Sequence, residues 1–145
     1  MFQQMNFFGQ TFFCIIRIDC YFLLQINTTR VQILGMSHIT GGGLPGNVPR
    51  MLPEKTPEGF VPVAEIEKSE HYNSWPELPI FSLLQQVSGL PDEELFPVFN
   101  MGIGFVICVA ETNEGIAREI LTKEGQPVFR IGQIVSGNKP EVCWK

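Results

Sequence analysis

The chain has 145 residues, of which 44% are hydrophobic and 17% are charged; this is typical of a globular domain with a core and excludes a disordered chain. The formal net charge is -5, the pI is near 5.0, and no two basic residues are adjacent. These values exclude general electrostatic binding of nucleic acid, which needs clustered Lys and Arg. The four cysteines form no CxxC pair, so the sequence argues against a zinc site and favours a reducing compartment.

The first segment, residues 1–26, is crowded with Phe, Ile, Leu and Cys. Arg17 and Asp19 interrupt this apolar run near its middle, whereas a membrane span needs about 20 consecutive apolar residues. A signal peptide needs a basic start and a small-residue cleavage site, and the segment has neither. These features argue against a membrane or export role. They leave open a buried strand or helix, or a segment that is foreign to the domain.

The next elements are a strand, a helix and a second strand. Residues 31–39 alternate loosely and predict a strand that enters a loop at Thr40. Residues 60–66 predict another strand, within a proline-rich connection. Pro45 and Pro49 predict that the helix between the two strands is short or begins near Asn47. Its apolar stripe is formed by Leu44, Val48, Met51 and Leu52.

Two more helices precede a strongly apolar strand. Asp92, Glu93 and Glu94 place acids at the start of a short helix that Pro97 limits, where they suit the helix dipole. Residues 101–110, MGIGFVICVA, predict a central strand that is buried on both faces, with Cys108 as a small buried hydrophobe. Before them, an amphipathic helix that stops at Gly89 and Pro91 is predicted by Ile80, Phe81, Leu83, Leu84 and Val87.

The last part of the chain predicts one helix and two strands. Thr112 is expected to cap a helix that runs to about Glu124 and ends at Gly125. The apolar face of this helix is formed by Ile116, Ile120 and Leu121. Residues 126–135 and 141–144 predict the last strands. Strands that alternate with helices indicate an α/β or α+β fold, a layered sheet with flanking helices.

The stretch SHITGGGLPGNVPRMLP, residues 37–53, is the main functional signal. A strand, three glycines and a helix start can hold an anion, because glycine permits positive φ and lets a ligand approach the backbone. The triplet matches neither the P-loop nor GxGxxG, and such a triplet is also typical of a flexible turn. His38 can move a proton near neutral pH, and Arg50 can clamp a phosphate. A structural histidine and a solvated arginine are the alternatives.

The same stretch resembles the signature A-H-I-T-G-G-G-x-x-x-N-[IV]-P-R-x-[LF]-P of the phosphoribosylformylglycinamidine cyclo-ligases, also called AIR synthetases. The resemblance covers about residues 35–135. The related selenophosphate synthetases and the large amidotransferase of the same pathway differ at this loop. Three further stretches are similar to motifs of the cyclo-ligases in the same order: SWPELPIFSLLQ (74–85), FPVFNMGIGFVICV (96–109) and GQPVFRIGQIV (125–135).

The resemblance implies a fold like the C-terminal domain of that family over residues 34–145, and it leaves 1–33 as an unmatched apolar segment. The family also has an N-terminal ATP-binding domain that lies outside the matched part. We therefore expect the chain to be a fragment of a longer enzyme or the product of a faulty gene model. The resemblance further implies a cytoplasmic protein, with the plastid as an alternative, and full-length enzymes that dimerise.

The activity implied by the resemblance is ATP-dependent ring closure of formylglycinamidine ribonucleotide to aminoimidazole ribonucleotide, a step of purine biosynthesis. The partner is thus a small nucleotide, and neither nucleic acid nor a membrane is expected. ATP and Mg²⁺ are implied as cofactors, bound with the N-terminal domain. We expect the fragment alone to be inactive. The alternatives are a non-catalytic folded fragment and a small membrane-associated protein.

The resemblance also implies roles for individual residues. His38 is implied as the catalytic residue, as hydrogen-bond donor or proton carrier. Asn100 is implied to approach the same site, with a turn-forming amide as the alternative. No metal ligand is predicted, and His71 is expected in an exposed polar loop. The residues implied to bind substrate or phosphate, or to brace the loop, are Thr40, Gly41, Gly42, Gly43, Asn47 and Arg50.

Overall fold

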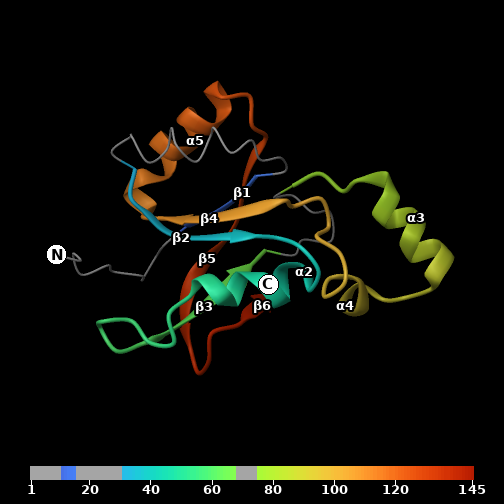
Figure 1. The fold of residues 1–145 in the computed structure, drawn as a ribbon, viewed down its shortest axis with the longest axis horizontal. Helices are drawn as coiled ribbons and strands as arrows, with labels where there is room; N and C mark the ends of the chain where they lie inside the picture. Colours follow the sequence, from blue (N-terminus) through green and yellow to red (C-terminus); the bar gives the residue numbers. More distant parts are fainter. Residues whose placement is uncertain (1–10, 16–30, 68–74) are drawn as a thin grey trace.

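The computed structural model describes residues 11–15, 31–67 and 75–145 of the chain. Its strands form a single six-stranded sheet in the order β2-β4-β1-β5-β3-β6 (Figure 1). All neighbouring strands are antiparallel except β3 and β6, which are parallel, so the predicted fold class is confirmed in its α+β form. The strands are β1 (Thr11–Ile15), β2 (Ile33–His38), β3 (Val61–Ile66), β4 (Phe105–Val109), β5 (Val128–Gly137) and β6 (Val142–Trp144).

Strand β4 lies inside the sheet and is buried along its whole length, which confirms the predicted central strand. Its side chains alternate between two apolar clusters. Phe105, Ile107 and Val109 belong to the cluster that contains helix α5 (Glu114–Lys123). Val106 and Cys108 belong to the larger cluster on the other face. The near-continuous apolar run therefore follows from packing on both faces of the sheet.

Residues 11–15 form β1, which pairs with β4 on one side and with β5 on the other. A strand was one of the alternatives that the sequence left open for residues 1–26. The rest of that segment and the loop of His71 lie outside the described residues. Of the described helices, none is long and apolar enough to cross a membrane.

The glycine turn leads into a short helix. The sequence predicted either a short helix or one that begins near Asn47, and the first alternative is confirmed. Helix α2 (Gly43–Asn47) begins at the third glycine and continues as the 3-10 helix η1 (Val48–Met51). Pro49 explains the change, because proline has no N–H to donate and its ring obstructs the preceding turn. The predicted stripe points inward, with Leu44 and Val48 fully buried.

The two predicted helices of the middle part are confirmed in position. Helix α3 (Pro79–Ser88) ends at Gly89, whose φ is 68°. Helix α4 (Asp92–Leu95) follows, with three acids in its first turn. None of the residues of α3 is buried, although five apolar side chains make the helix amphipathic. Figure 1 shows α3 extending away from the sheet.

Helix α5 corrects two details of the prediction. Thr112 does not cap it, because Thr112 lies within a 3-10 turn (Glu111–Asn113) and Asn113 precedes the helix without a side-chain cap bond. The buried positions are Ala117 and Leu121, whereas Ile116 is 52% exposed. Of the predicted apolar face, Leu121 is buried and Ile120 packs against the same cluster, so only Ile116 departs from the prediction. The predicted end is confirmed, since Gly125 follows with a φ of 72°.

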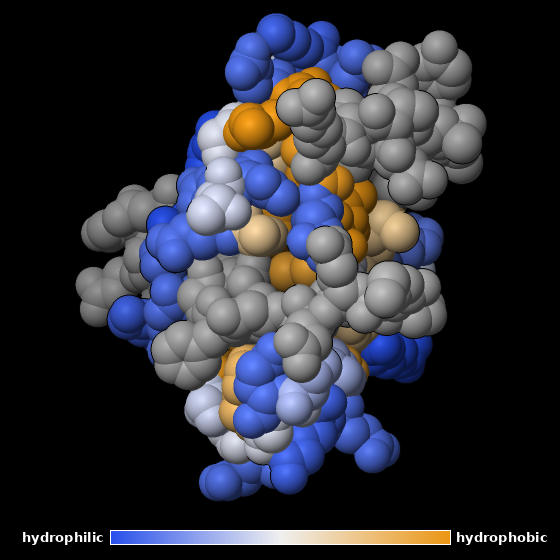
Figure 2. Space-filling model, turned by 90° about the vertical axis from the view of Figure 1, so that its left-hand side faces the viewer, coloured by the Kyte–Doolittle hydropathy of each residue, from blue (hydrophilic) through white to orange (hydrophobic). Residues whose placement is uncertain are grey.

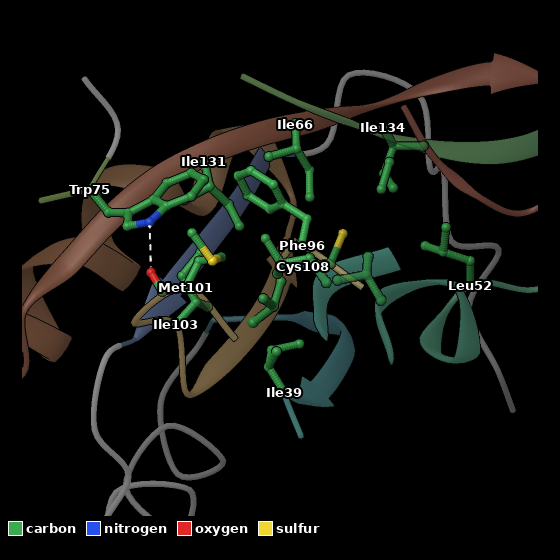
Figure 3. Packing of buried hydrophobic residues seen from close by; sticks show 14 of the residues in the cluster. Ile39, Leu52, Ile66, Trp75, Phe96, Met101, Ile103, Cys108, Ile131 and Ile134 are labelled. Carbon is green, nitrogen blue, oxygen red and sulfur yellow. Dashed lines mark hydrogen bonds between the residues drawn. The ribbon is translucent and has the colours of Figure 1, made fainter. Parts of the chain in front are cut away.

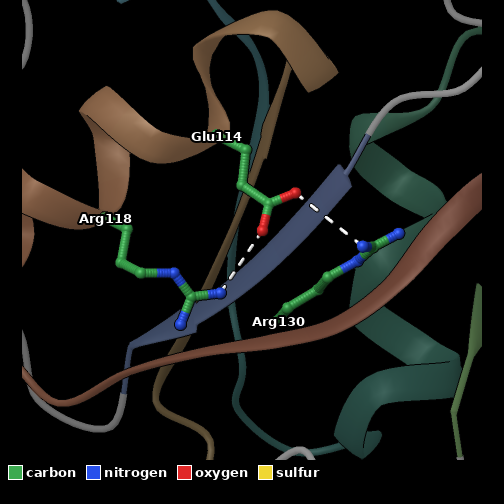
Figure 4. A network of polar contacts seen from close by, with 3 residues as sticks. All are labelled: Glu114, Arg118 and Arg130. Atoms are coloured by element: carbon green, nitrogen blue, oxygen red, sulfur yellow. Dashed lines mark hydrogen bonds and ion pairs between the residues drawn. The ribbon is translucent and has the colours of Figure 1, made fainter.

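A polar contact ties α5 to the sheet. Glu114 lies 3.3 Å from Arg118 one turn along α5 and 3.8 Å from Arg130 on β5 (Figure 4). Both arginine side chains are more than 40% exposed. Pairs that are this accessible contribute at most about 1 kcal/mol each. The attachment of α5 therefore depends on its buried apolar side chains.

The larger cluster connects the segments that precede and follow α3. Trp75 is 1% exposed and donates its Nε1–H to the carbonyl oxygen of Met101 at 3.2 Å (Figure 3). Phe96 packs in the same cluster and lies 4.4 Å from Trp144, between ring centroids. These contacts hold the chain from 96 to 104 against the sheet.

The surface is mixed in character. Figure 2 shows hydrophobic residues at the centre of one face, with hydrophilic residues around them. This agrees with a mean hydropathy of +0.11 for the chain. Apolar atoms are common on protein surfaces, so only contiguous and ordered apolar patches carry information about partners.

Candidate functional site

The glycine turn joins the end of β2 to the start of α2. Gly42 and Gly43 have φ values of 98° and 56°, a left-handed conformation that side chains other than glycine rarely adopt. The turn is closed by two backbone hydrogen bonds, from Gly43 N to Thr40 O at 3.0 Å and from Gly46 N to Gly42 O at 2.8 Å. The triplet is therefore a defined turn.

Gly43 is the point where the turn meets a second loop. A Cβ atom at Gly43 would lie 1.8 Å from the carbonyl oxygen of Phe96 and 2.7 Å from that of Phe99. Ile39 N also donates to Gly104 O at 3.0 Å. The structure thus brings together the stretches 37–53 and 96–109, which the sequence singled out separately.

The opposite side of the turn is open. A Cβ atom at Gly41 would have no heavy atom within 4 Å. Among the residues that the structure describes, none accepts a hydrogen bond from the amides of Gly41 and Gly42. Backbone N–H groups without a partner among the described residues are available to an anionic group. The amide of Gly43 differs, because it is already bonded to Thr40 O.

Asn47 holds the turn from within. It is 3% exposed, and its Nδ2 donates to the carbonyl oxygens of Gly43 at 2.8 Å, Gly41 at 3.3 Å and Thr40 at 3.4 Å. Its Oδ1 accepts from the Thr40 hydroxyl and from Arg50 Nη1, both at 3.4 Å. The resemblance implied that Asn47 either binds substrate or braces the loop. Because all of these contacts are made within the loop, they favour the bracing role.

The side chains around the open side of the turn are exposed. His38, Thr40 and Arg50 are all accessible. His38 ends β2 opposite Phe105, and the two ring centroids are 6.4 Å apart. An imidazole, a hydroxyl and a guanidinium are therefore exposed within a few residues of the two open amides in the chain, and these group types can bind an anion and move a proton.

Asn100 lies on the neighbouring loop, where its side chain is used locally. Its Oδ1 accepts from Gly102 N at 3.1 Å, and its carbonyl oxygen accepts from Ile103 N at 2.9 Å. These bonds favour the turn-forming alternative. Met101 in the same turn has a φ of 53°, which is uncommon for a residue with a side chain.

The resemblance implied that Asn100 approaches the site, but sequence reasoning missed that backbone carbonyl oxygens of its loop lie against Gly43. The carbonyl oxygens of Phe96 and Phe99 define the space next to Gly43, and the left-handed Met101 sits between them and Gly104 along the chain. The position of a backbone carbonyl oxygen cannot be inferred from residue type. The FN-x-G motif was the only sequence signal that pointed to this loop. Within residues 11–15, 31–67 and 75–145, no group of three His, Cys, Asp or Glu residues could hold a metal ion.

Fold and turn together define a mixed α+β domain with an exposed glycine-rich turn at the end of an edge strand. The chain belongs to the AIR synthase related proteins, as their C-terminal domain: the family model matches residues 17–145. The predicted membership is thereby confirmed. The predicted division at residues 33 and 34 stays a prediction.

Three curated relatives are named phosphoribosylformylglycinamidine cyclo-ligase. The protein of Geobacillus kaustophilus is 42% identical over 115 residues, which are 79% of this chain and 30% of that relative. The protein of Bacillus cereus (strain AH187) is 44% identical over 108 residues, 74% of this chain and 28% of the relative. That of Nitrosococcus oceani is 43% identical over 105 residues, 72% and 26% respectively. The chain thus spans less than a third of these relatives.

Proposed function

We propose that this chain supplies the C-terminal domain of a phosphoribosylformylglycinamidine cyclo-ligase, a ligase of purine biosynthesis. The observation that carries the proposal is the 42% identity to a relative of that name. The exposed turn beside His38 supports it, because it offers the group types that this chemistry requires. A cytosolic or plastid location and dimerisation of the complete enzyme belong to the same proposal.

The reaction sets the demands on the site. The formyl amide oxygen of formylglycinamidine ribonucleotide takes the γ-phosphoryl group of ATP, and ADP leaves. An amidine nitrogen then attacks the activated carbon, the carbon–oxygen bond breaks, and that oxygen leaves as part of phosphate. The attacking nitrogen also loses a proton. Such steps need positioning, neutralisation of developing charge and a proton acceptor.

The residues of the turn can meet these demands. We assign the phosphate contacts to the open amides of Gly41 and Gly42 and to the Thr40 hydroxyl, since the amide of Gly43 is occupied within the turn. His38 would donate to the reacting oxygen or accept the proton of the attacking nitrogen. Arg50 is exposed and within reach of the loop through Asn47, so it would balance phosphate charge.

In this proposal, ATP and Mg²⁺ are bound by a domain other than this one. The described residues of this chain provide no group of carboxylates that fits Mg²⁺. No step of the reaction is therefore assigned to the metal on this chain. We propose that the nucleotide and its metal are held by an ATP-binding domain, against which the turn would be placed.

The test is to restore the complete enzyme. This chain would be mixed with the part of the Geobacillus kaustophilus relative that precedes its matched segment, and ATP-dependent ring closure would be assayed. We expect activity in the mixture, and a loss of about 100-fold or more for His38→Ala. His71→Ala is the control and should leave the rate unchanged. Equal effects of the two substitutions would contradict the role of His38, and no activity with both parts folded would favour a non-catalytic domain.

A further inference from the structure

Helix α3 carries two apolar sides, and only one of them is used by the described fold. On the inner side, Phe81 lies 6.2 Å from Phe99 between ring centroids. On the outer side, Ile80, Leu83 and Val87 are 50%, 53% and 79% exposed. Their spacing of three and four residues places them on one face of the helix. We call these three residues the α3 stripe.

The α3 stripe lies on a helix that is held by contacts near both of its ends. Gln85 on α3 donates to Asp92 Oδ1 on α4 at 2.7 Å, and Gly89 closes the helix with a bond to the carbonyl oxygen of Gln85 at 2.8 Å. Leu78, just before the helix, packs against Gly102. A row of exposed apolar side chains on such a fixed element is typical of a surface that another protein covers.

The chain segments that flank α3 are acidic, and we call their glutamates the acidic border. Glu77 precedes α3, and Glu93 and Glu94 follow it on α4. Residues 69–117 contain no Lys or Arg, and α3 itself has no charged residue. In the part of the chain that the structure describes, no ion pair involves Glu77, Glu93 or Glu94. No ion pair of the described residues therefore offsets these three carboxylates.

We propose that the α3 stripe and its acidic border dock the remainder of the cyclo-ligase, through an apolar surface bordered by Lys and Arg. The inference rests on the proposed function. A second copy of this chain does not fit, because a two-fold contact would place the acidic border against itself. The relatives supply an occupant, because the matched segment is 30% of the Geobacillus kaustophilus protein and most of that protein lies outside it.

The experiment measures association of this complete chain with the preceding part of the Geobacillus kaustophilus relative by sedimentation. The double substitution Leu83→Ser with Val87→Ser should weaken binding at least tenfold, because it removes the apolar contact without touching a buried residue. Ile116→Ser on α5 is the matched control, since Ile116 is 52% exposed and Leu83 is 53% exposed. Glu93→Lys with Glu94→Lys should also weaken binding, and added salt should reduce the affinity of the unsubstituted chain.

The outcomes separate this inference from the proposed function. Equal affinity of the stripe variant and the Ile116→Ser variant would overturn the docking surface, even if ring closure occurs. Self-association of the chain that the stripe substitutions abolish would overturn it as well, in favour of a second copy. Binding that depends on the stripe without ring closure would leave the docking surface standing while the proposed function fails. If the relative's part does not fold alone, the same variants are placed in a chimera in which this chain replaces the matched segment of the relative. We expect the unsubstituted chimera to unfold in a single thermal transition and the stripe substitutions to split it into two. A transition that stays single in the stripe variant would overturn the proposal.

Discussion

The side-chain Nδ2 of Asn47 lies 2.8 Å from the carbonyl oxygen of Gly43, and Asn47 is 3% exposed. A buried side chain on the last residue of α2 thus holds the first residue of the same helix. Because the same amide also contacts Gly41 and Thr40, the open edge of the turn depends on one residue beneath it. This relationship makes the site testable without substrate.

Asn47→Asp should lower the free energy of unfolding by about 1–3 kcal/mol, because the carboxylate cannot donate to the three carbonyl oxygens. Urea titration followed by circular dichroism measures the loss. Asn113→Ala is the control, since the Asn113 side chain forms no cap bond with α5, and it should change the stability by less than about 0.5 kcal/mol. If the Asn47→Asp chain is as stable as the unsubstituted chain, the bracing role is refuted.

The three glycines of the turn should respond in a graded series. Gly43→Ala combines positive φ with a Cβ atom 1.8 Å from Phe96 O, so we expect a loss of about 2–5 kcal/mol. Gly42→Ala has the φ penalty with ordinary contacts and should cost about 1–2 kcal/mol. Gly41→Ala meets no atom within 4 Å and should stay within about 1 kcal/mol. Thermal unfolding of the three variants gives the order, and a different order would contradict this geometry.

Trp75→Phe should destabilise the chain by about 1–3 kcal/mol, because it leaves the buried carbonyl oxygen of Met101 without the indole donor. Trp144→Phe is the matched control, as Trp144 is 36% exposed, and its effect should stay below about 1 kcal/mol. Unfolding followed by circular dichroism compares the two without relying on tryptophan emission. Similar losses for both variants would argue against the contact.

Cys108 predicts a loss of stability in alkali. Burial raises the pKa of the Cys108 thiol from 9.0 to about 12. Above pH 9 the unfolded chain releases this proton while the folded chain keeps it, so the stability falls with rising pH until about pH 12. The slope attributable to Cys108 is about 1.4 kcal/mol per pH unit.

Cys108→Ala should remove that slope while lowering stability at neutral pH, where the smaller side chain leaves a cavity. Urea titrations at pH 7, 9 and about 10.5 measure both effects. Cys143→Ala serves as the comparison, because Cys143 is only partly buried. If the Cys108→Ala chain loses stability in alkali as steeply as the unsubstituted chain, another group carries the effect.

Most elements could be predicted from local patterns, and the exceptions have a common cause. The apolar run of β4 and the loose alternation of residues 31–39 around β2 each show in a few neighbouring residues. The cap at Thr112 could not be decided in this way, because the residue pattern did not reveal the 3-10 turn that holds Thr112 before α5 begins. The exposure of the apolar residues of α3 could not be predicted either, because an amphipathic sequence pattern is the same whether or not a partner covers the apolar face.

For the candidate site, the sequence pointed to the glycine loop, but it did not show which residues of the loop are buried or hydrogen-bonded and which are open. Residue types alone could not tell that Asn47 is turned inward while Arg50 is exposed, because both lie on the same short helical stretch. Nor could they separate the bonded amide of Gly43 from the open amides of Gly41 and Gly42. These distinctions depend on hydrogen bonds that exist only in the folded turn, from Gly43 N to Thr40 O and from Asn47 to the backbone of the turn.

By itself, the sequence determined the family, the order of strands and helices, and the position of the glycine turn, because these depend on residue type and spacing along the chain. Only the tertiary structure decided which glycine is required for packing, which side chain braces the turn, and which apolar face stays uncovered. The physical reason is that these properties arise from atoms that are distant in the chain and adjacent in space, such as Gly43 and the carbonyl oxygen of Phe96.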